Sequence, residues 1–232
     1  MNYLKTIFFG AFIVCAILLG IVFFVGQRHA TQENKPILFQ ENINQLKELG
    51  RTKYQQSLRY LAYAHHAERD SMLDVASLFH ALSHADAIHN ANCRHAIEAL
   101  GGEYTHPIIS PTQFTSTTSH LEKTLHNKSA THCNLMPHYI GQALSYNNRY
   151  VARMLTWCDA SDVKQIILLQ EMLEVSAPRH KHIYKVCPTC GDITWEDIAT
   201  RHCPMCMTDS ALFKIITPTH TQKLSAKEPR FE

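Results

Sequence analysis

Apolar residues recur at helical spacing along residues 75–100, in alternating steps of three and four positions. The stripe comprises Val75, Phe79, Leu82, Asp86, His89, Cys93, Ala96 and Leu100. This spacing is typical of the buried face of an amphipathic helix. Two ionisable residues, Asp86 and His89, nevertheless share the stripe. Since burying such groups costs free energy unless they are paired or bind a metal ion, the pattern predicts an Asp–His pair, a stripe that reaches the surface, or a metal ligand set.

The same periodicity predicts four long helices in the body of the chain. They cover residues 41–67, then from a turn at 68–71 to residue 100, residues 120–158 with a break near Pro137, and residues 163–184 after a turn at 159–162. Gly101 and Gly102 end the second helix, as C-terminal glycines do. Residues 103–119 contain two prolines and a Ser/Thr cluster, which favours a crossover loop between the second and third helices.

Similar short segments indicate that the four helices form two related hairpins. The segment RYLA at 59–62 recurs as RYVA at 149–152. Each copy lies in a helix that a short polar turn joins to a second helix, which ends near His89 or His180. Two helical hairpins joined by one long crossover form a four-helix bundle of the ferritin type. We therefore expect a mainly α fold with a ferritin-like bundle over residues 31–184, the alternative being a chance similarity of two amphipathic hairpins.

The N-terminus predicts a membrane anchor over residues 1–30. Residues 6–26 carry no charge and are long enough to cross a hydrocarbon core of ~30 Å as a helix. A cleaved signal peptide is the main alternative, but its apolar region usually spans ~7–15 residues, and Arg28 would precede the cleavage site by three positions. A lipoprotein signal at Cys15 lacks the small residue expected before it. The short N-terminal tail with Lys5 favours a body outside the cytoplasm.

Composition narrows the classes of partner. The 22 Lys and Arg residues nearly balance the 20 acidic ones, so a net charge of +2 gives no case for a nucleic-acid partner. The unusual counts are 16 His and 8 Cys. Because both residue types bind metals, their placement carries the functional information.

Four cysteines near the C-terminus have the spacing of a metal site. In CPTCGDITWEDIATRHCPMC, Cys187 and Cys190 form one C-x2-C pair, and Cys203 and Cys206 form the second. Each pair brings two thiolates to one turn, and the two turns can close a tetrahedral site around one iron or zinc ion. Two disulfides are the alternative. We expect a metal-stabilised module over residues 185–217, followed by a polar tail over 218–232.

The spacing of the four cysteines does not distinguish iron from zinc. A zinc ion would be structural and inert, whereas an iron with four sulfur ligands would carry one electron. The other cysteines are isolated and are expected to be buried as small apolar groups. They are Cys15, Cys93, Cys133 and Cys158.

Helical hairpins followed by C-x2-C-G-x11-C-P-x-C resemble the rubrerythrin family over about residues 40–216. The segment RYLAYAHHAERDSMLDVASLF, the LGG at 100–102 and the ALFKII at 211–216 carry the resemblance further. It implies a ferritin-like diiron domain that reduces hydrogen peroxide, and a rubredoxin-like module with short β-strands whose metal centre relays electrons. Members of this family commonly form dimers, so the resemblance also implies a homodimer.

The diiron ligands of the family carry over only partly in the first hairpin. Such a site needs a Glu from each of two helices and a Glu-x-x-His motif from each of the other two. The first-helix glutamate falls at Lys53, and the Glu-x-x-His motif becomes Asp86-x-x-His89. In the absence of metal, Lys53 could be the cation that pairs with Asp86.

The second hairpin keeps still fewer ligands. The internal similarity puts its first-helix carboxylates near Ala143 and Tyr146, while an alternative alignment through Pro137 puts Lys128 at the glutamate position. The last motif reads APRH over residues 177–180 and keeps only its histidine. Neither alignment restores an acid, so we predict that the ordinary diiron site is absent.

Two other arrangements of metal ligands in the bundle stay open. A rearranged cage would use Asp86, His89 and His180 with Cys93. Separately, His80 and His84 are one helical turn apart and could bind a metal, while His65 and His66 lie beside the first hairpin turn. Isolated surface histidines are the more common outcome for such residues.

Three functions are consistent with these features of the sequence. We favour a membrane-anchored, rubrerythrin-like redox protein whose four-cysteine iron centre passes electrons to a partner protein. The second is an oxidoreductase, a peroxide reductase of rubrerythrin type with a rearranged metal cage. The third is a zinc-stabilised binding or scaffold module without enzymatic activity. About one iron per chain favours the first, about three favour the second, and a colourless protein with one zinc favours the third.

Overall fold

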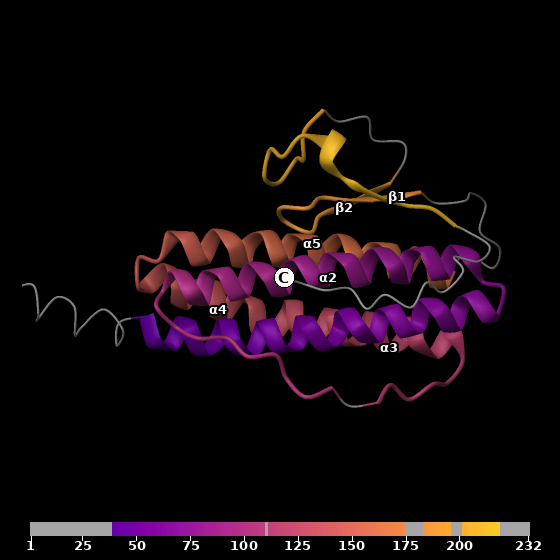
Figure 1. Ribbon diagram of the computed structural model, residues 1–232, viewed down its shortest axis with the longest axis horizontal. Coiled ribbons are helices and arrows are strands. Elements are labelled where there is room, and N and C mark those ends of the chain that lie inside the picture. The colour runs from indigo at the N-terminus through magenta and orange to yellow at the C-terminus, as the bar shows by residue number, and fades with distance from the viewer. Residues whose placement is uncertain (1–38, 110, 175–182, 196–200, 219–232) are drawn as a thin grey trace, which may run out of the picture. The chain divides into compact units, whose positions relative to one another are not determined.

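The computed structural model describes residues 39–109, 111–174, 183–195 and 201–218, so the predicted anchor lies outside the described residues. The chain divides into two units, Met1–Glu41 and Asn42–Glu232. The second unit contains a bundle of four long helical segments and a small three-stranded sheet (Figure 1). Among the described residues, no helix has the length and apolar character needed to cross a membrane.

The first hairpin joins a helix described over residues 39–69 to α2, Leu73–Ala99. Between them, Ser71 adopts the left-handed conformation with φ 59°. The backbone N–H of Met72 donates to the carbonyl of Ala67 (2.9 Å), and that of Ser71 donates to the carbonyl of Glu68 (3.1 Å). These two hydrogen bonds form a Schellman motif, which ends a helix and reverses the chain.

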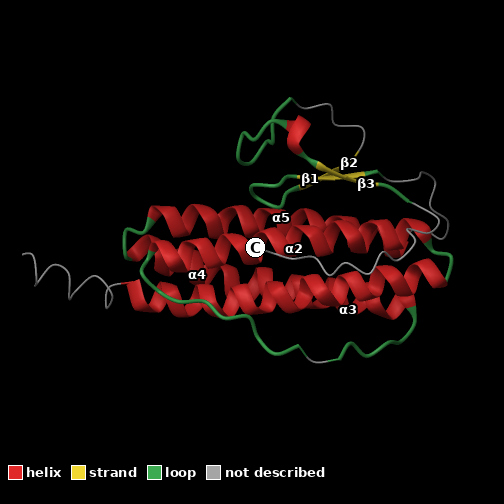
Figure 2. Cartoon of the chain, viewed as in Figure 1, coloured by secondary structure: helices red, strands yellow, loops and turns green. Residues whose placement is uncertain are grey.

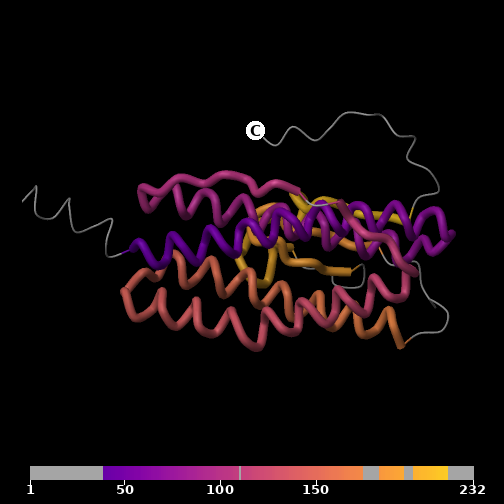
Figure 3. The backbone as a smooth tube through the Cα atoms, turned by 90° about the horizontal axis from the view of Figure 1, so that it is seen from below, coloured from indigo at the N-terminus to yellow at the C-terminus, as the bar shows by residue number. Residues whose placement is uncertain are grey.

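The predicted end of the second helix is confirmed. Gly101 has φ 82°, and the N–H groups of Gly101 and Gly102 donate to the carbonyls of Glu98 and Ile97. The chain then follows the outside of the bundle to the far end, where α3 begins (Figures 2 and 3). Ser116 caps α3 by accepting a hydrogen bond from the N–H of Ser119.

The second hairpin differs from the prediction in where it turns. Its helical segments are α3 (Thr117–Ala130), a π turn η1 (Thr131–Leu135), α4 (Met136–Ser145) and α5 (Arg149–Glu174). Asn147 takes φ 54°, and the N–H groups of Asn148 and Asn147 donate to the carbonyls of Ala143 and Leu144. This is the same Schellman motif as in the first hairpin, so the turn lies at 146–148.

The predicted turn at 159–162 and the predicted helix boundary at 163 are therefore wrong, because these residues lie inside α5. The polar side chains of this segment form hydrogen bonds with neighbouring elements instead of with solvent. Asp159 accepts a hydrogen bond from Nδ1 of His132 (2.7 Å), and the hydroxyl of Ser161 donates to the carbonyl of Gly191 (2.9 Å). A polar run inside a helix resembles a turn in sequence when its partners lie far along the chain.

The C-terminal sheet packs on α2 and α5. Its strands are β1 (Tyr184–Val186), β2 (Ile193–Trp195) and β3 (Lys214–Ile216), in the antiparallel order β2-β1-β3. β1 and β3 contact α2, and β2 contacts α5. Tyr184, Val186 and Ile193 share one apolar core with the bundle residues Phe79 and Leu168. Burial of apolar area on the bundle thus fixes the position of the cysteine-bearing loops.

Candidate metal centres

The four C-terminal cysteines lie in two matching turns. The N–H of Gly191 donates to the carbonyl of Cys187 (3.0 Å), and the N–H of Met207 donates to that of Cys203 (3.0 Å). Gly191 and Met207 both have positive φ, 74° and 64°. Each turn therefore curls back on its first cysteine and presents two sulfur atoms to the same space.

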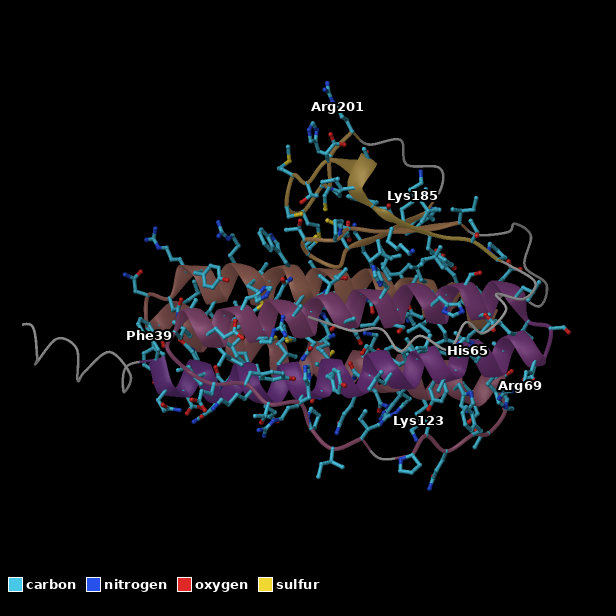
Figure 4. All side chains as sticks on the ribbon, in the orientation of Figure 1. Phe39, His65, Arg69, Lys123, Lys185 and Arg201 are labelled. Atoms are coloured by element: carbon cyan, nitrogen blue, oxygen red, sulfur yellow. The ribbon has the colours of Figure 1, made fainter. Side chains whose placement is uncertain are left out.

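The sulfur atoms of the two turns meet. Cys187 Sγ is 3.5 Å from Cys206 Sγ, and Cys190 Sγ is 3.6 Å from Cys203 Sγ. All four lie within 4.8 Å of one another, and the sulfur atoms gather inside the module in Figure 4. A tetrahedral site with metal–sulfur bonds of about 2.3 Å places its sulfurs about 3.8 Å apart. The cluster therefore fits one metal ion, and these cysteines form no disulfide.

The cysteine module is hydrogen-bonded directly to the bundle. Nε2 of His89 lies 3.0 Å from the carbonyl oxygen of Cys190, and Lys164 forms an ion pair with the buried Asp192 (2.7 Å). Gly191 fits against α2 only because it has no side chain, since an added Cβ would lie 2.5 Å from Nε2 of His89. His89 thus connects the module to the interior of the bundle.

Four buried charges occupy the centre of the bundle. Lys53 Nζ lies 3.1 Å from Asp86 and 2.5 Å from Asp162. Lys128 Nζ lies 3.3 Å from both oxygens of Asp86 and 2.9 Å from Asp162. All four side chains are at most 1% exposed. We call these residues the ion-pair ring, because each ammonium contacts both carboxylates and each carboxylate contacts both ammonium groups.

The ring holds both carboxylates and Lys53 in their charged forms. Burial raises the pKa of Asp86, but Lys128, Lys53 and the hydrogen bond to His89 outweigh burial and hold that pKa far below its usual range. The pKa of Asp162 is likewise lowered by Lys128 and Lys53 against the effect of burial. For Lys53, burial lowers the pKa, but the two carboxylates raise it well above its usual value.

His89 has an oxygen acceptor on each ring nitrogen. Nδ1 lies 3.3 Å from Asp86 Oδ1, and Nε2 faces the carbonyl of Cys190. Burial lowers the pKa of His89, but Cys158 and the hydrogen bond to Asp86 raise it to about 9. Both nitrogens donate in the imidazolium form only, so this geometry also favours a protonated ring.

The structure confirms the predicted pairing of Lys53 with Asp86 and adds Asp162, which was not predicted from the sequence. Asp86 lies 15 residues after the turn residue Ser71, and Asp162 lies 15 residues after Asn147. The two hairpins are therefore related through their turns, and the predicted similarity of residues 59–62 to 149–152 has the wrong register. The left-handed preference of asparagine was the available signal for the turn at Asn147.

The corrected register also explains the positions of Lys128 and Gln165. Gln165 occupies the position in α5 that His89 occupies in α2, 18 residues after the turn. Lys53 lies 18 residues before Ser71, whereas Lys128 lies 19 before Asn147. The extra residue falls in the helix that contains η1, where a π turn accommodates more residues than an α turn. Lys128 therefore reaches the same level of the bundle as Lys53.

Other predicted site residues lie elsewhere. Cys93 is buried in a separate apolar cluster with Leu46 and Met154, and Cys158 shares that cluster. Cys133 is exposed, so its predicted burial is wrong, because it falls in the π turn on the outer side of the bundle helix. His180 and Cys15 lie outside the described residues.

Two further groups of potential metal ligands occur among the described residues. Ligand atoms of Asp86, His89 and Asp162 lie within 4.8 Å of one another, as do those of His65, Glu68 and His80. His80, which could have bound a metal together with His84, contacts Glu68 across the hairpin (2.8 Å). His66 instead faces the hydroxyl of Thr117 (3.2 Å).

Comparison with known proteins finds one matching family model and several similar solved structures. The rubrerythrin family model matches residues 51–160. The solved structure of nigerythrin in its fully reduced, all-ferrous state is 19% identical, with a TM-score of 0.70 over 75% of this chain and 86% of that one. An open-pore ferritin from the archaeon Archaeoglobus fulgidus is 12% identical, with a TM-score of 0.51 over 58% of this chain and 82% of that one.

No curated protein sequence matches the chain. The helical bundle nevertheless precedes the four-cysteine module in the chain, which is the order that the sequence resemblance predicts. The chain thus matches the rubrerythrin family over residues 51–160, and its fold is that of nigerythrin.

Proposed function

We propose that this chain is a membrane-anchored electron-transfer protein related to rubrerythrins. Its redox centre would be a single iron bound by Cys187, Cys190, Cys203 and Cys206, and its bundle would lack a diiron site. The observation that carries the proposal is the contrast between the two sites. Four sulfurs converge with the spacing of a metal site, whereas Lys53 and Lys128 neutralise the carboxylates of the bundle.

The residues of the module suit a one-electron relay. Iron bound by four thiolates alternates between the ferric and ferrous states and so supplies one electron at a time. Three of the cysteines are fully buried, which keeps water from the sulfurs, while Cys206 is partly exposed. The backbone N–H groups of Thr189 and Cys190 hydrogen-bond to the sulfur of Cys187, and hydrogen bonds to ligand sulfur are one means of setting the reduction potential. A partner would exchange electrons on the Cys206 side.

The ligands in the bundle do not fit two iron ions. A ferritin-like diiron site uses four carboxylates and two histidines, whereas the described interior offers Asp86, Asp162 and His89. Both carboxylates are already within hydrogen-bond distance of two ammonium groups. If two divalent ions bound here, most of their positive charge would be uncompensated, and the buried lysines would repel them. We therefore propose that the ion-pair ring replaces the metals.

The membrane part of the proposal rests on the sequence. Residues 6–26 are uncharged and long enough to span a bilayer, and residues 1–30 are proposed as a single-pass anchor with the body outside the cytoplasm. Such an anchor would keep the redox centre beside the membrane. The partner is then a redox protein at the same surface, and a homodimer of the bundle is a further proposal from the family resemblance.

Metal analysis of the full-length chain tests this function. Protein purified in detergent without added metal is expected to contain about one iron per chain, to show sulfur-to-iron charge-transfer bands and to undergo reversible one-electron reduction. About three irons per chain would support the peroxide reductase with a rearranged cage. A colourless protein with one zinc would support the scaffold function instead.

A charge-reversal variant tests the replacement of metals by lysines. Lys53→Glu combined with Lys128→Glu restores carboxylates at both positions, so we expect it to bind additional iron in the bundle. The matched control combines Lys47→Glu with Lys123→Glu, two lysines on the same helices that are less buried. An unchanged iron content in a folded double variant would contradict the assignment of these positions as former ligand positions.

A further inference from the structure

A second cluster of potential ligands lies at the end of the bundle that holds the first hairpin turn. His65 and Glu68 occupy the last turn of the first helix, and His80 lies on the second turn of α2. Figure 4 shows His65 near this end, well away from the cysteine module. The Schellman motif at Ser71 holds the two helices beside each other, so donors from both face one another without a flexible loop between them.

The geometry of this cluster centres on the carboxylate of Glu68. Nδ1 of His65 lies 3.1 Å from Oε2, and Nε2 of His80 lies 2.8 Å from Oε1. The two imidazole rings are nearly perpendicular, at 80°, with centroids 5.5 Å apart. Nitrogen and oxygen donors bound to one metal ion at about 2.0–2.2 Å are separated by about 2.9–3.5 Å. The two nitrogen–oxygen separations are therefore close to those of ligands around one ion, and one ligand atom from each of the three residues lies within 4.8 Å of the other two.

We infer that His65, Glu68 and His80 form a binding site for a divalent transition-metal ion of the Zn²⁺ class. Two imidazoles and one carboxylate suit such borderline ions better than Ca²⁺ or Mg²⁺, which prefer oxygen ligands alone. The side chains are 43%, 31% and 26% exposed, so water can complete the coordination shell. The site is separate from the four cysteines and does not depend on the proposed electron transfer.

Occupation of this site has a structural consequence. Because His80 comes from α2 and the other two ligands come from the first helix, the ion would clip the two helices together next to their turn. A ligand that binds only the folded chain raises its apparent stability in proportion to the logarithm of ligand concentration. Zn²⁺ should therefore raise the thermal unfolding temperature of the hairpin.

The test uses the full chain as purified, with the four-cysteine site already loaded, and titrates it with Zn²⁺ by calorimetry and thermal unfolding. We expect one further Zn²⁺ per chain and a concentration-dependent rise in unfolding temperature. His80→Ala and Glu68→Gln should each weaken this binding by at least about tenfold, as the loss of a metal-site group typically does. His95→Ala, an exposed histidine also on α2, is the matched control and should leave it unchanged.

Co²⁺ gives a second readout that separates this site from exchange at the cysteines. Co²⁺ at a site of nitrogen and oxygen donors shows weak visible bands without the intense sulfur charge-transfer bands of a thiolate site. Appearance of the weak bands in the wild-type chain, and their loss in Glu68→Gln, supports the site. Absence of a further bound ion in the wild type, or binding that persists in both His80→Ala and Glu68→Gln, overturns it.

Discussion

Lys53 Nζ lies 2.5 Å from the carboxylate of Asp162, although 109 residues separate the two in the chain. The contact joins the first helix to α5 in the interior of the bundle. Together with Lys128 and Asp86 it closes a ring in which two positive charges balance two negative ones. Because the charges balance, the ring can be buried in the low-dielectric interior. The removal of one member would leave a buried charge unpaired and should lower the free energy of unfolding.

Lys128→Met should lower the free energy of unfolding by about 3–5 kcal/mol, because it leaves two buried carboxylates facing one ammonium group. Chemical denaturation of the full chain measures this change. Lys123→Met removes an exposed lysine from the same helix and should have little effect.

A double variant separates lost charge from lost packing. Asp162→Asn in the Lys128→Met background restores one positive and one negative charge, so the double variant should lose less stability than the sum of the two single variants. Additive losses would show that the four charges are not coupled.

Stability should fall in acid because the folded-state pKa values of Asp86 and Asp162 are lowered. Their contribution is fully present above the unfolded-state pKa of about 3.9 and is lost as pH falls toward the folded-state values. Each such carboxylate contributes a slope of up to about 1.4 kcal/mol per pH unit. The slope below about pH 4 should be shallower in Asp162→Asn and unchanged in Glu122→Gln, an exposed site on α3.

Gly191→Ala should loosen the cysteine module from the bundle. The new Cβ would lie 2.5 Å from Nε2 of His89 and 3.1 Å from the carbonyl of Ala85, at a residue with φ 74°. We expect a loss of about 1–3 kcal/mol and faster hydrogen exchange in β1. Gly141→Ala in α4 is the control, since its Cβ would contact nothing within 4 Å and should stabilise the helix by about 0.5–1 kcal/mol.

Asn147→Ala should destabilise the second hairpin by about 1 kcal/mol, because alanine disfavours the left-handed conformation that residue 147 adopts. Asn147→Gly should leave the free energy of unfolding nearly unchanged, since glycine adopts this conformation freely. Equal losses in both variants, measured by thermal unfolding, would place the turn elsewhere.

Much of the architecture could be predicted from the sequence. The three-four spacing from Val75 to Leu100 predicted α2, the glycines predicted its end, and the two C-x2-C pairs predicted the convergence of four sulfurs. These features depend on local spacing, which a single sequence displays. Lys53 and Asp86 were also predicted to pair, because a cation at a ligand position needs a buried partner.

The second half of the ring could not be predicted, because its partners meet only in three dimensions. Asp162 lies in DASD, which reads as a turn until Lys53 and Lys128 are placed beside it. Lys128 was found only through an alternative alignment, because the similarity of residues 59–62 to 149–152 gave the wrong register for the second hairpin. The contact of His89 with the module depends on tertiary packing and left no local pattern.

The π turn at Thr131–Leu135 has a consequence for symmetry. A one-residue insertion in a regular α-helix rotates everything beyond it by about 100° and shifts it by about 1.5 Å, which would turn Lys128 away from the interior. With the insertion confined to the π turn, Lys128 and Asp162 form an ion pair in the second hairpin (2.9 Å) that matches the pair of Lys53 and Asp86 in the first (3.1 Å). The two hairpins thus differ in length and still contribute equivalent halves of one charge-balanced centre.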